Sequence, residues 1–198
     1  PLVGVFNASN FICVYAVAEL LEVAQNDFLP VLSTLKGATG RFQMVHTKSN
    51  ITAIVDYAHT PDALVQVLDT ITTLRTRNEK LITVVGCGGN RDKAKRPLMA
   101  KAAVDKSDLT IFTSDNPRNE DPNDIINDML EGVPVESNQK HLTVLNRAQA
   151  IKTACTMAQD QDIILVAGKG HETYQDQKGE RLPFDDMQEL IRNLQSKR

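Results

Sequence analysis

Polar residues suited to binding an amino acid follow several apolar runs of this sequence. Arg91 follows a glycine-rich stretch, Asp115 and Arg118 open and close the motif DNPR, and Glu172 ends the motif GKGHE. The planar guanidinium of arginine grips a carboxylate through two hydrogen bonds, and a charge-assisted bond of this kind contributes about 1.5–3 kcal/mol. Carboxylates in turn bind ammonium groups. The residue types therefore predict a site for a small zwitterion such as an amino acid, with a nucleotide nearby as a second expectation.

Two glycine-rich motifs also have a purely structural interpretation. GCGGNRD (86–92) fits a tight turn as well as an anion-binding loop, and it fails the dinucleotide fingerprint because Arg91 stands where the third glycine belongs. GKGHE is not a phosphate loop, since Gly170 follows the lysine where Ser or Thr is required. Its informative part is a pair of glycines that let the backbone approach a ligand, followed by Glu172. His171 alone fits a structural role better than a catalytic one.

The motif DNPR is harder to explain as a turn alone. An Asx turn before Pro117 accounts for Asp115 or Asn116, but it gives Arg118 no role. An arginine at a strand exit is therefore the strongest sign of ligand binding in the chain. His59, just before a predicted helix, fits either a helix cap or a site residue.

The hydrophobic pattern predicts the elements that must position these residues. Thr60 as a cap, Pro61 at the first helical position and Asp62 in the first turn mark the clearest helix. Its apolar residues share one face, namely Leu64, Val67, Leu68, Ile71 and Leu74. The same reasoning predicts helices over 10–24, 28–36, 60–77, 93–106, 122–130, 147–159 and 186–195, strands over 42–47, 51–58, 81–85, 109–113, 142–145 and 162–167, a turn at Ser49–Asn50, and a hairpin near 174–184.

Alternating strands and helices predict an α/β fold of the Rossmann type. Its sheet would be mostly parallel with helices on both faces, and the loops at the carboxyl ends of the strands would meet along one edge. The polar motifs follow four of the predicted strands, so this edge is the expected binding site. Residues 146–148, after a weaker strand, contribute only Asn146 and Arg147.

Composition narrows the function classes. The 198 residues carry a net charge of −3, with 41% apolar and 24% charged residues, which is ordinary for a globular protein and gives no sign of a nucleic-acid surface. No apolar run is long enough to span a bilayer, and FICVYAVAELL lacks the basic leader and cleavage site of a signal peptide. The cysteines Cys13, Cys87 and Cys155 match no disulfide or zinc pattern and are expected to be free thiols. The chain begins at Pro1, and a short loop before residue 10 leads directly into an amphipathic helix with nothing before it to pack against, so we expect a fragment that starts inside a domain.

The motifs DYAHTPDAL, GCGGNRDKAKRPLM, TSDNPRNEDP and VAGKGHETYQ resemble the C-terminal part of the Mur ligases, in the same order and spacing. The resemblance covers Gly4 to about Leu194. It implies that residues 1–41 are the tail of a central ATPase domain with its hinge, and that residues 42–198 are a Rossmann-like domain that brings the incoming amino acid. The resemblance also implies that the family's phosphate loop and magnesium-binding lysine are expected upstream of this sequence.

The resemblance also implies roles for individual residues. The predicted amino-acid site consists of Arg91, Asp115, Asn116, Pro117, Arg118, Gly168 and Glu172. The predicted nucleotide contacts are Asn10, Arg41, Asp56 and His59. No catalytic or metal-binding residue is implied within this chain. Asn90 departs from the family, which more often has Asp before the arginine.

The implied reaction is ATP-dependent amide formation through an acyl phosphate in cytoplasmic peptidoglycan precursor synthesis. The resemblance is strongest to members that add meso-diaminopimelate to UDP-N-acetylmuramoyl-L-alanyl-D-glutamate, because lysine-adding members usually lack the arginine of DNPR. ATP and Mg²⁺ are the implied cofactors, bound mainly by the central domain, and a monomer without nucleic-acid or membrane partners is expected. The isolated fragment is expected to be inactive. A lysine-adding Mur ligase, a folate-tailing relative and a non-catalytic amino-acid-binding module remain the alternatives.

Overall fold

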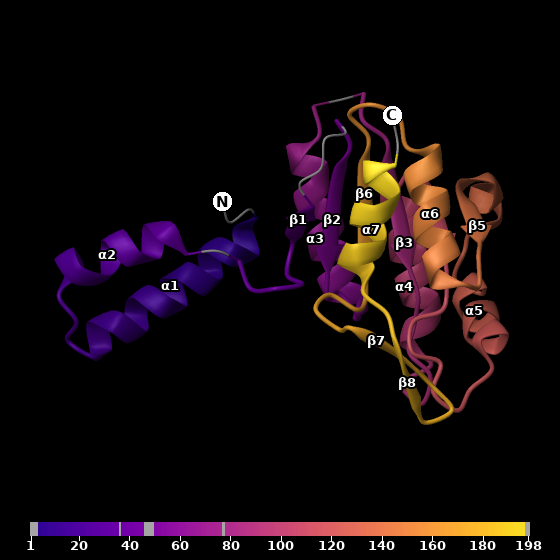
Figure 1. Ribbon diagram of the computed structural model, residues 1–198, viewed down its shortest axis with the longest axis horizontal. Helices are drawn as coiled ribbons and strands as arrows, with labels where there is room; N and C mark the ends of the chain where they lie inside the picture. The colour runs from indigo at the N-terminus through magenta and orange to yellow at the C-terminus, as the bar shows by residue number, and fades with distance from the viewer. Residues whose placement is uncertain (1–3, 36, 46–49, 77, 197–198) are drawn as a thin grey trace. The chain divides into compact units, whose positions relative to one another are not determined.

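The computed structural model describes residues 4–35, 37–45, 50–76 and 78–196 of the chain. It divides into two compact units, Pro1–Ala38 and Thr39–Arg198. The first unit consists of two helices, α1 (Val5–Leu20) and α2 (Gln25–Thr34) (Figure 1).

Both helices of the first unit begin earlier than the sequence predicts. The prediction of a loop before residue 10 is wrong, because α1 starts directly after Gly4. The positive φ of Gly4, 99°, is not helical and sets the start of the helix. None of residues 5–9 is a glycine or proline, so nothing interrupts the helix. Glu22 adopts a left-handed φ of 55°, which explains why α1 does not continue to residue 24.

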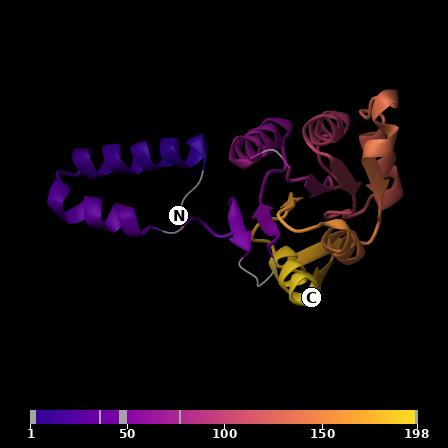
Figure 2. The same cartoon turned by 90° about the horizontal axis from the view of Figure 1, so that it is seen from above.

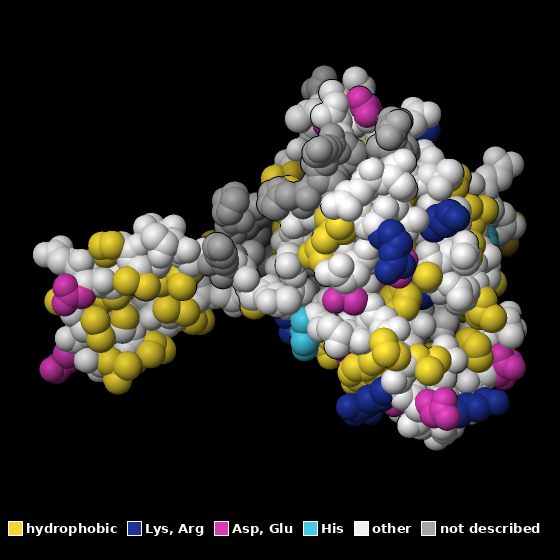
Figure 3. Space-filling view, viewed as in Figure 1, with side chains coloured by type: hydrophobic (Ala, Val, Ile, Leu, Met, Phe, Trp, Pro, Cys, Tyr) yellow, Lys and Arg dark blue, Asp and Glu magenta, His cyan; other side chains and the backbone are white. Residues whose placement is uncertain are grey.

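The first unit exposes much of its apolar surface. Ile12 is 68% exposed, Val17 55% and Leu20 83%, and Figure 3 shows hydrophobic side chains gathered over this part of the chain. None of the described side chains of α2 is buried. Contiguous apolar surface of this kind is typical of a face that packs against other protein.

The second unit is built on a mostly parallel sheet. Its strands run in the order β1-β2-β6-β3-β4-β5, with β1 antiparallel to β2 and the other pairs parallel. A separate hairpin pairs β7 with β8. The bounds are β1 Gln43–Val45, β2 Thr52–Asp56, β3 Leu81–Val85, β4 Leu109–Phe112, β5 His141–Thr143, β6 Ile163–Ala167, β7 Tyr174–Gln177 and β8 Glu180–Pro183.

Helices cover both faces of this sheet, as Figure 2 shows. One face carries α3 (Pro61–Leu74), α4 (Lys95–Lys106) and α5 (Pro122–Leu130), and the other carries α6 (Arg147–Met157) and α7 (Asp186–Gln195). A 3₁₀ helix, Val135–Lys140, precedes β5. Strands β3 and β6 are buried along their whole length, as expected for parallel strands covered on both sides. The α/β fold with a mostly parallel sheet is therefore confirmed.

Local sequence signals fix most element ends in this unit. Thr60 caps α3 by accepting a hydrogen bond from the backbone of Ala63, and Asp121 caps α5 in the same way. On α3 the predicted apolar residues are buried except Leu74, which is 49% exposed. Of the strand predicted over 42–47, β1 spans Gln43–Val45 and so begins one residue later. Residues 46 and 47, and Ser49 of the predicted turn, lie outside the described residues. The 3₁₀ helix had no counterpart in the prediction.

Candidate functional site

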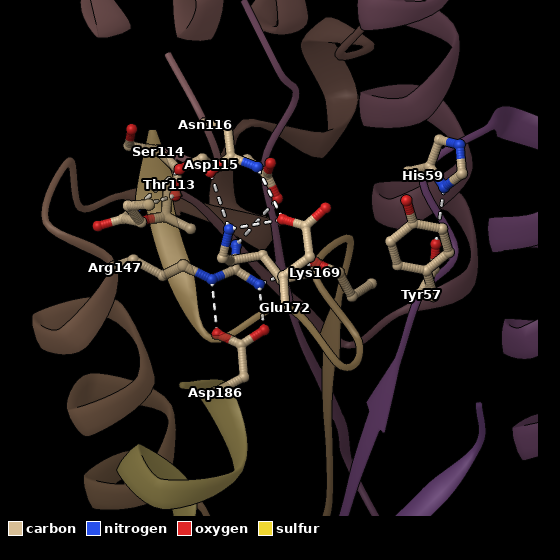
Figure 4. Close-up of polar contacts among 12 residues, drawn as sticks. Tyr57, His59, Thr113, Ser114, Asp115, Asn116, Arg147, Lys169, Glu172 and Asp186 are labelled. Carbon is tan, nitrogen blue, oxygen red and sulfur yellow. Dashed lines mark hydrogen bonds and ion pairs between the residues drawn. The ribbon is translucent and has the colours of Figure 1, made fainter. Parts of the chain in front are cut away.

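The candidate site lies where β2, β6, β3 and β4 end. These strands are parallel neighbours in the sheet, so the loops at their carboxyl ends share one edge. Every predicted site residue of the second unit lies at or just after one of these ends, apart from Arg41, which precedes β1. Figure 4 shows side chains from the β4 and β6 loops pointing toward one another.

Asn116, Lys169 and Glu172 form a closed polar triangle at this edge (Figure 4). Asn116 donates from Nδ2 to Glu172 Oε2 over 2.8 Å, and Lys169 donates from Nζ to the same oxygen over 2.9 Å. Lys169 also donates to Asn116 Oδ1 over 2.9 Å. Burial raises the pKa of Glu172, but these hydrogen bonds, together with the charges of Lys169 and Arg118, outweigh it and hold the pKa below its usual value.

A second buried network lies beside the triangle. Arg147 has a fully buried side chain and grips Asp186 through Nε and Nη2, both at 2.7 Å, while Nη2 also donates to the carbonyl of Ala167 over 3.0 Å. Its Nη1 atom lies 3.9 Å from Asp115 Oδ2, and neither of these two buried atoms has a hydrogen-bond partner among the described residues. Burial raises the pKa of Asp115. The positive charges of Arg147 and Lys169 oppose that rise, whereas the negative charge of Glu172 adds to it.

Gly168 leaves room for the Asp115 carboxylate. Its φ of 114° is a backbone conformation that L side chains rarely adopt, and a Cβ placed there would lie 2.8 Å from Asp115 Oδ2. The predicted site residue Gly168 is thus explained by packing against another predicted site residue. Whether it also contacts a ligand stays a prediction.

Arg118 is held by the hairpin that follows the site. It has a left-handed φ of 52°, unusual for a residue with a side chain. Its backbone N–H donates to the carbonyl of Asp176 over 2.9 Å, and its carbonyl accepts from Lys178 over 2.7 Å. Nη1 donates to the carbonyl of Gly89 over 2.9 Å, and Nε lies 4.0 Å from Asp176 Oδ2. Within the described part of the chain no hydrogen bond uses Nη2, so one edge of the guanidinium is available.

Arg91 lies on an exposed part of the neighbouring glycine-rich loop. This loop packs closely on DNPR, since the backbone N–H of Gly89 donates to the carbonyl of Asn116 over 2.9 Å. Arg96, fully buried, ties the same region together through Glu120 at 2.9 Å and Asp128 at 2.7 Å. The loop that carries Arg91 is therefore fixed next to Asn116, while the Arg91 side chain remains exposed.

Asp56 has a structural role that the sequence does not predict. Its Oδ2 accepts from the backbone of Phe42 and its Oδ1 from the backbone of Ala58, both over 2.7 Å. Burial raises the pKa of Asp56, although the two backbone hydrogen bonds and Arg41 oppose that rise. Asp56 thus anchors the segment before β1 to the end of β2, and a contact with a nucleotide stays a prediction.

Arg41 and His59 belong to an exposed aromatic cluster around Tyr57. The Arg41 guanidinium lies 4.7 Å from the centre of the Tyr57 ring, and the rings of His59 and His171 lie 4.6 and 5.2 Å from it. Tyr57 is half-buried, whereas Arg41, His59 and His171 are exposed. The structure therefore brings together two predicted nucleotide contacts with two residues that were not predicted.

The remaining predicted contact, Asn10, is exposed on α1 of the first unit. It lies within α1, in agreement with the helix predicted over 10–24. Its proposed contact with adenine stays a prediction.

Sequence reasoning missed Arg147, Lys169 and Asp186. Arg147 was dismissed as part of a weak strand exit, and Lys169 as part of a failed phosphate loop. A local signal did exist, because Arg147 is the first residue of α6, where a cation opposes the helix dipole. This position marks Arg147 as unusual but does not show that it is buried or identify its partner, which is Asp186 at the first position of α7.

The structure offers no metal site in the part of the chain that it describes. No group of three or more His, Cys, Asp or Glu side chains there could hold a metal ion. The helices of the described residues also include none long and apolar enough to cross a bilayer.

Comparison with known proteins gives the family of this chain. The model of the family described as "Mur ligase, glutamate ligase domain" matches residues 40–170. The chain belongs to the Mur ligases. The match begins at Gly40, in the segment that precedes β1, and ends within the GKGHE loop, so it includes the amino-acid site predicted above except Glu172.

Several curated relatives of this chain share one name, UDP-N-acetylmuramoyl-L-alanyl-D-glutamate–2,6-diaminopimelate ligase. That of Cytophaga hutchinsonii is 56% identical over 98% of this chain and 40% of its own length, and that of Bacteroides fragilis is 55% identical over 95% and 39%. A solved structure of a ligase with this name covers 98% of this chain and 39% of its own, with 43% identity and a TM-score of 0.75. The chain thus spans about 40% of the length of the curated relatives it matches.

Proposed function

We propose that this chain is the part of an ATP-dependent ligase that binds meso-diaminopimelate and presents its amine to UDP-N-acetylmuramoyl-L-alanyl-D-glutamate. The D-glutamate side-chain carboxylate would first be phosphorylated by ATP, and the amine would then displace phosphate from the acyl phosphate. The chain's share is to hold the amine in line for attack. The relatives' shared name and the zwitterion site at the sheet edge support this proposal.

The arrangement of Arg118 beside Glu172 is the observation that carries the proposal. Diaminopimelate differs from lysine by a second carboxylate next to its far ammonium group. Arg118 has an unused guanidinium edge within the described residues for that carboxylate, and Glu172 has an ionised carboxylate for the ammonium. Lysine would leave Arg118 without its partner, and sites built around such contacts reject analogues by factors on the order of 10⁴ or more.

The other predicted residues take the remaining contacts in this proposal. Arg91 and the loop Asp115–Pro117 would hold the rest of the amino acid, and Gly168 would help to close the site. Arg41, Asp56, His59 and Asn10 would contact the nucleotide. The Tyr57 cluster supports a nucleotide contact, because a cation and two histidines are exposed around one ring.

The domain assignment is part of the same proposal. Residues 1–41 would be the tail and hinge of a central ATPase domain, and residues 42–198 the amino-acid-binding domain. The exposed apolar surface of α1 and α2 supports this, since such a surface fits a face that packs against more of the same domain. ATP and Mg²⁺ would be held mainly by that central domain, in a cytoplasmic, monomeric enzyme, and this chain alone would not form the amide bond.

An NMR titration tests the proposal. The amide resonances of the chain are followed while meso-diaminopimelate, L-lysine or L-glutamate is added. We expect diaminopimelate alone to shift the resonances of Arg91, Asn116, Arg118 and Glu172. An equal response to lysine would favour the lysine-adding branch of the family. If the longer protein binds zwitterions in general and ATP does not change that binding, a non-catalytic binding module would be favoured instead.

A further inference from the structure

Lys169 is a buried charge to which the proposed function gives no role. Its side chain is 0% exposed, and its ammonium group hydrogen-bonds Asn116 and Glu172 over 2.9 Å each. Burying an ammonium group is costly unless it is paired and hydrogen-bonded. The proposed function gives both partners, Asn116 and Glu172, a role in ligand binding. The position of Lys169 therefore affects how these two residues can contact the ligand.

Lys169 restricts which atoms of this pair can meet a ligand. Glu172 Oε2 accepts from both Lys169 and Asn116, whereas no hydrogen bond from any described residue reaches Oε1. Asn116 Oδ1 accepts from Lys169 and from the backbone of Asp176 over 2.9 Å each. The carboxylate of Glu172 is therefore held on one oxygen, which leaves the other oriented for a ligand.

Lys169 also changes the charge that a ligand meets. Glu172 alone would attract any ammonium group, but its pairing with Lys169 cancels that charge locally. Arg118 adds a positive charge nearby, as its opposing effect on the pKa of Glu172 shows. A group that combines an ammonium with a carboxylate can use both Glu172 and Arg118. A lone ammonium meets the neutralised Glu172–Lys169 pair and leaves Arg118, whose Nε lies 4.0 Å from Asp176 Oδ2, without a ligand partner.

We propose that Lys169 is a positioning and specificity-determining residue, which orients Glu172 and cancels its charge so that the site prefers a zwitterionic end group to a lone ammonium. This inference rests on the proposed function, because it assumes that Glu172 and Arg118 bind the far end of a diamino acid. Specificity is a difference of two affinities, so an unfavourable charge balance against the wrong ligand acts as strongly as a new contact to the right one.

Calorimetric binding of meso-diaminopimelate and L-lysine tests the inference. The variant Lys169→Gln keeps a hydrogen-bond donor but removes the charge, and Lys169→Met removes both. Lys101→Gln is the matched control, because it makes the same charge change on an exposed part of α4, where Lys101 pairs with Asp105. We expect the ratio of the lysine Kd to the diaminopimelate Kd to fall on the order of tenfold in Lys169→Gln and to stay unchanged in Lys101→Gln.

The outcomes separate the inference from the proposed function. If Lys169→Gln weakens the binding of both ligands equally, so that the ratio of their Kd values is unchanged, Lys169 has only a structural role and the inference is overturned. A wild-type chain that binds neither amino acid would overturn the proposed function and the selectivity together. Carbon-13 NMR of the Glu172 carboxyl gives a ligand-free check: its pKa should rise in Lys169→Gln, and an unchanged pKa would contradict the charge cancellation.

Discussion

The buried network around Arg147 and the exposed cluster around Tyr57 lie at the same edge of the sheet but are built in opposite ways. Arg147 and Asp186 are completely buried and share a two-pronged ion pair. Tyr57 is surrounded by Arg41, His59 and His171, all exposed to solvent. In the network, charges are fixed by other charges, whereas the cluster is held by ring contacts that water can reach.

The difference indicates that the buried network and the exposed cluster have different roles at this edge of the sheet. A buried ion pair repays its desolvation only when its geometry is good, so removing one partner leaves a costly uncompensated charge. Exposed cation–π and ring contacts contribute little to stability and leave their polar groups free for a ligand. We therefore expect the network to determine the shape of the amino-acid site and the cluster to act mainly through what it binds.

Arg147→Met should give the largest effect. It leaves the buried Asp186 carboxylate without its partner, which should lower the free energy of unfolding by about 3–5 kcal/mol, measured by urea denaturation. The double variant Arg147→Met with Asp186→Leu should recover much of this loss, because it removes the stranded charge. A single variant as stable as the wild type would contradict the account of the network.

Arg118→Ala should affect binding more than folding. Its guanidinium is partly exposed, and in the proposed function it pairs with the far carboxylate of diaminopimelate. Losing one charge-assisted contact of about 1.5–3 kcal/mol should weaken diaminopimelate binding by about 10- to 150-fold and leave lysine binding nearly unchanged. Arg192→Ala, an exposed arginine on α7, is the control. A preference for diaminopimelate that survives Arg118→Ala would remove this residue from the specificity site.

Glu172→Gln should show a defined pH dependence. The pKa of Glu172 is lowered in the folded chain, so its ionised form stabilises the fold above the unfolded pKa of about 4.3, and this contribution disappears as pH falls through the folded pKa. The glutamine can still accept from Lys169, so we expect a loss of about 1 kcal/mol at neutral pH. Urea denaturation at pH 7 and near pH 3 should show the gap between wild type and variant closing in acid, and a constant gap would refute the assignment.

Tyr57→Leu should have the smallest effect on stability. It removes the ring contacts to Arg41, His59 and His171 but opens no fully buried space, so the change should be below about 1 kcal/mol in thermal unfolding. A loss as large as that of Arg147→Met would mean that the cluster is part of the core and that the comparison between the two regions is wrong.

The sequence alone predicted the fold class, most helices and strands of the second unit, and the loops that hold the candidate site. These features depend on neighbouring residues: Thr60 and Asp121 cap helices within their own turn, and the apolar runs of β3 and β6 read as buried strands. The residues of DNPR and GKGHE were found for the same reason, because each motif is local. The start of α1 was missed since Gly4 alone marks it.

The tertiary structure decided which charges are paired. Arg147 meets Asp186 across 39 positions, and Lys169 meets Asn116 across 53, so no local pattern could show that either cation is buried. The tertiary structure also places the Asp56 carboxylate where it accepts hydrogen bonds from the backbone N–H groups of Phe42 and Ala58. The motif that contains Asp56 does not reveal this role. The reason is physical: the protonation and orientation of a buried charge depend on every group within a few ångströms, and the fold, not the sequence order, brings those groups together.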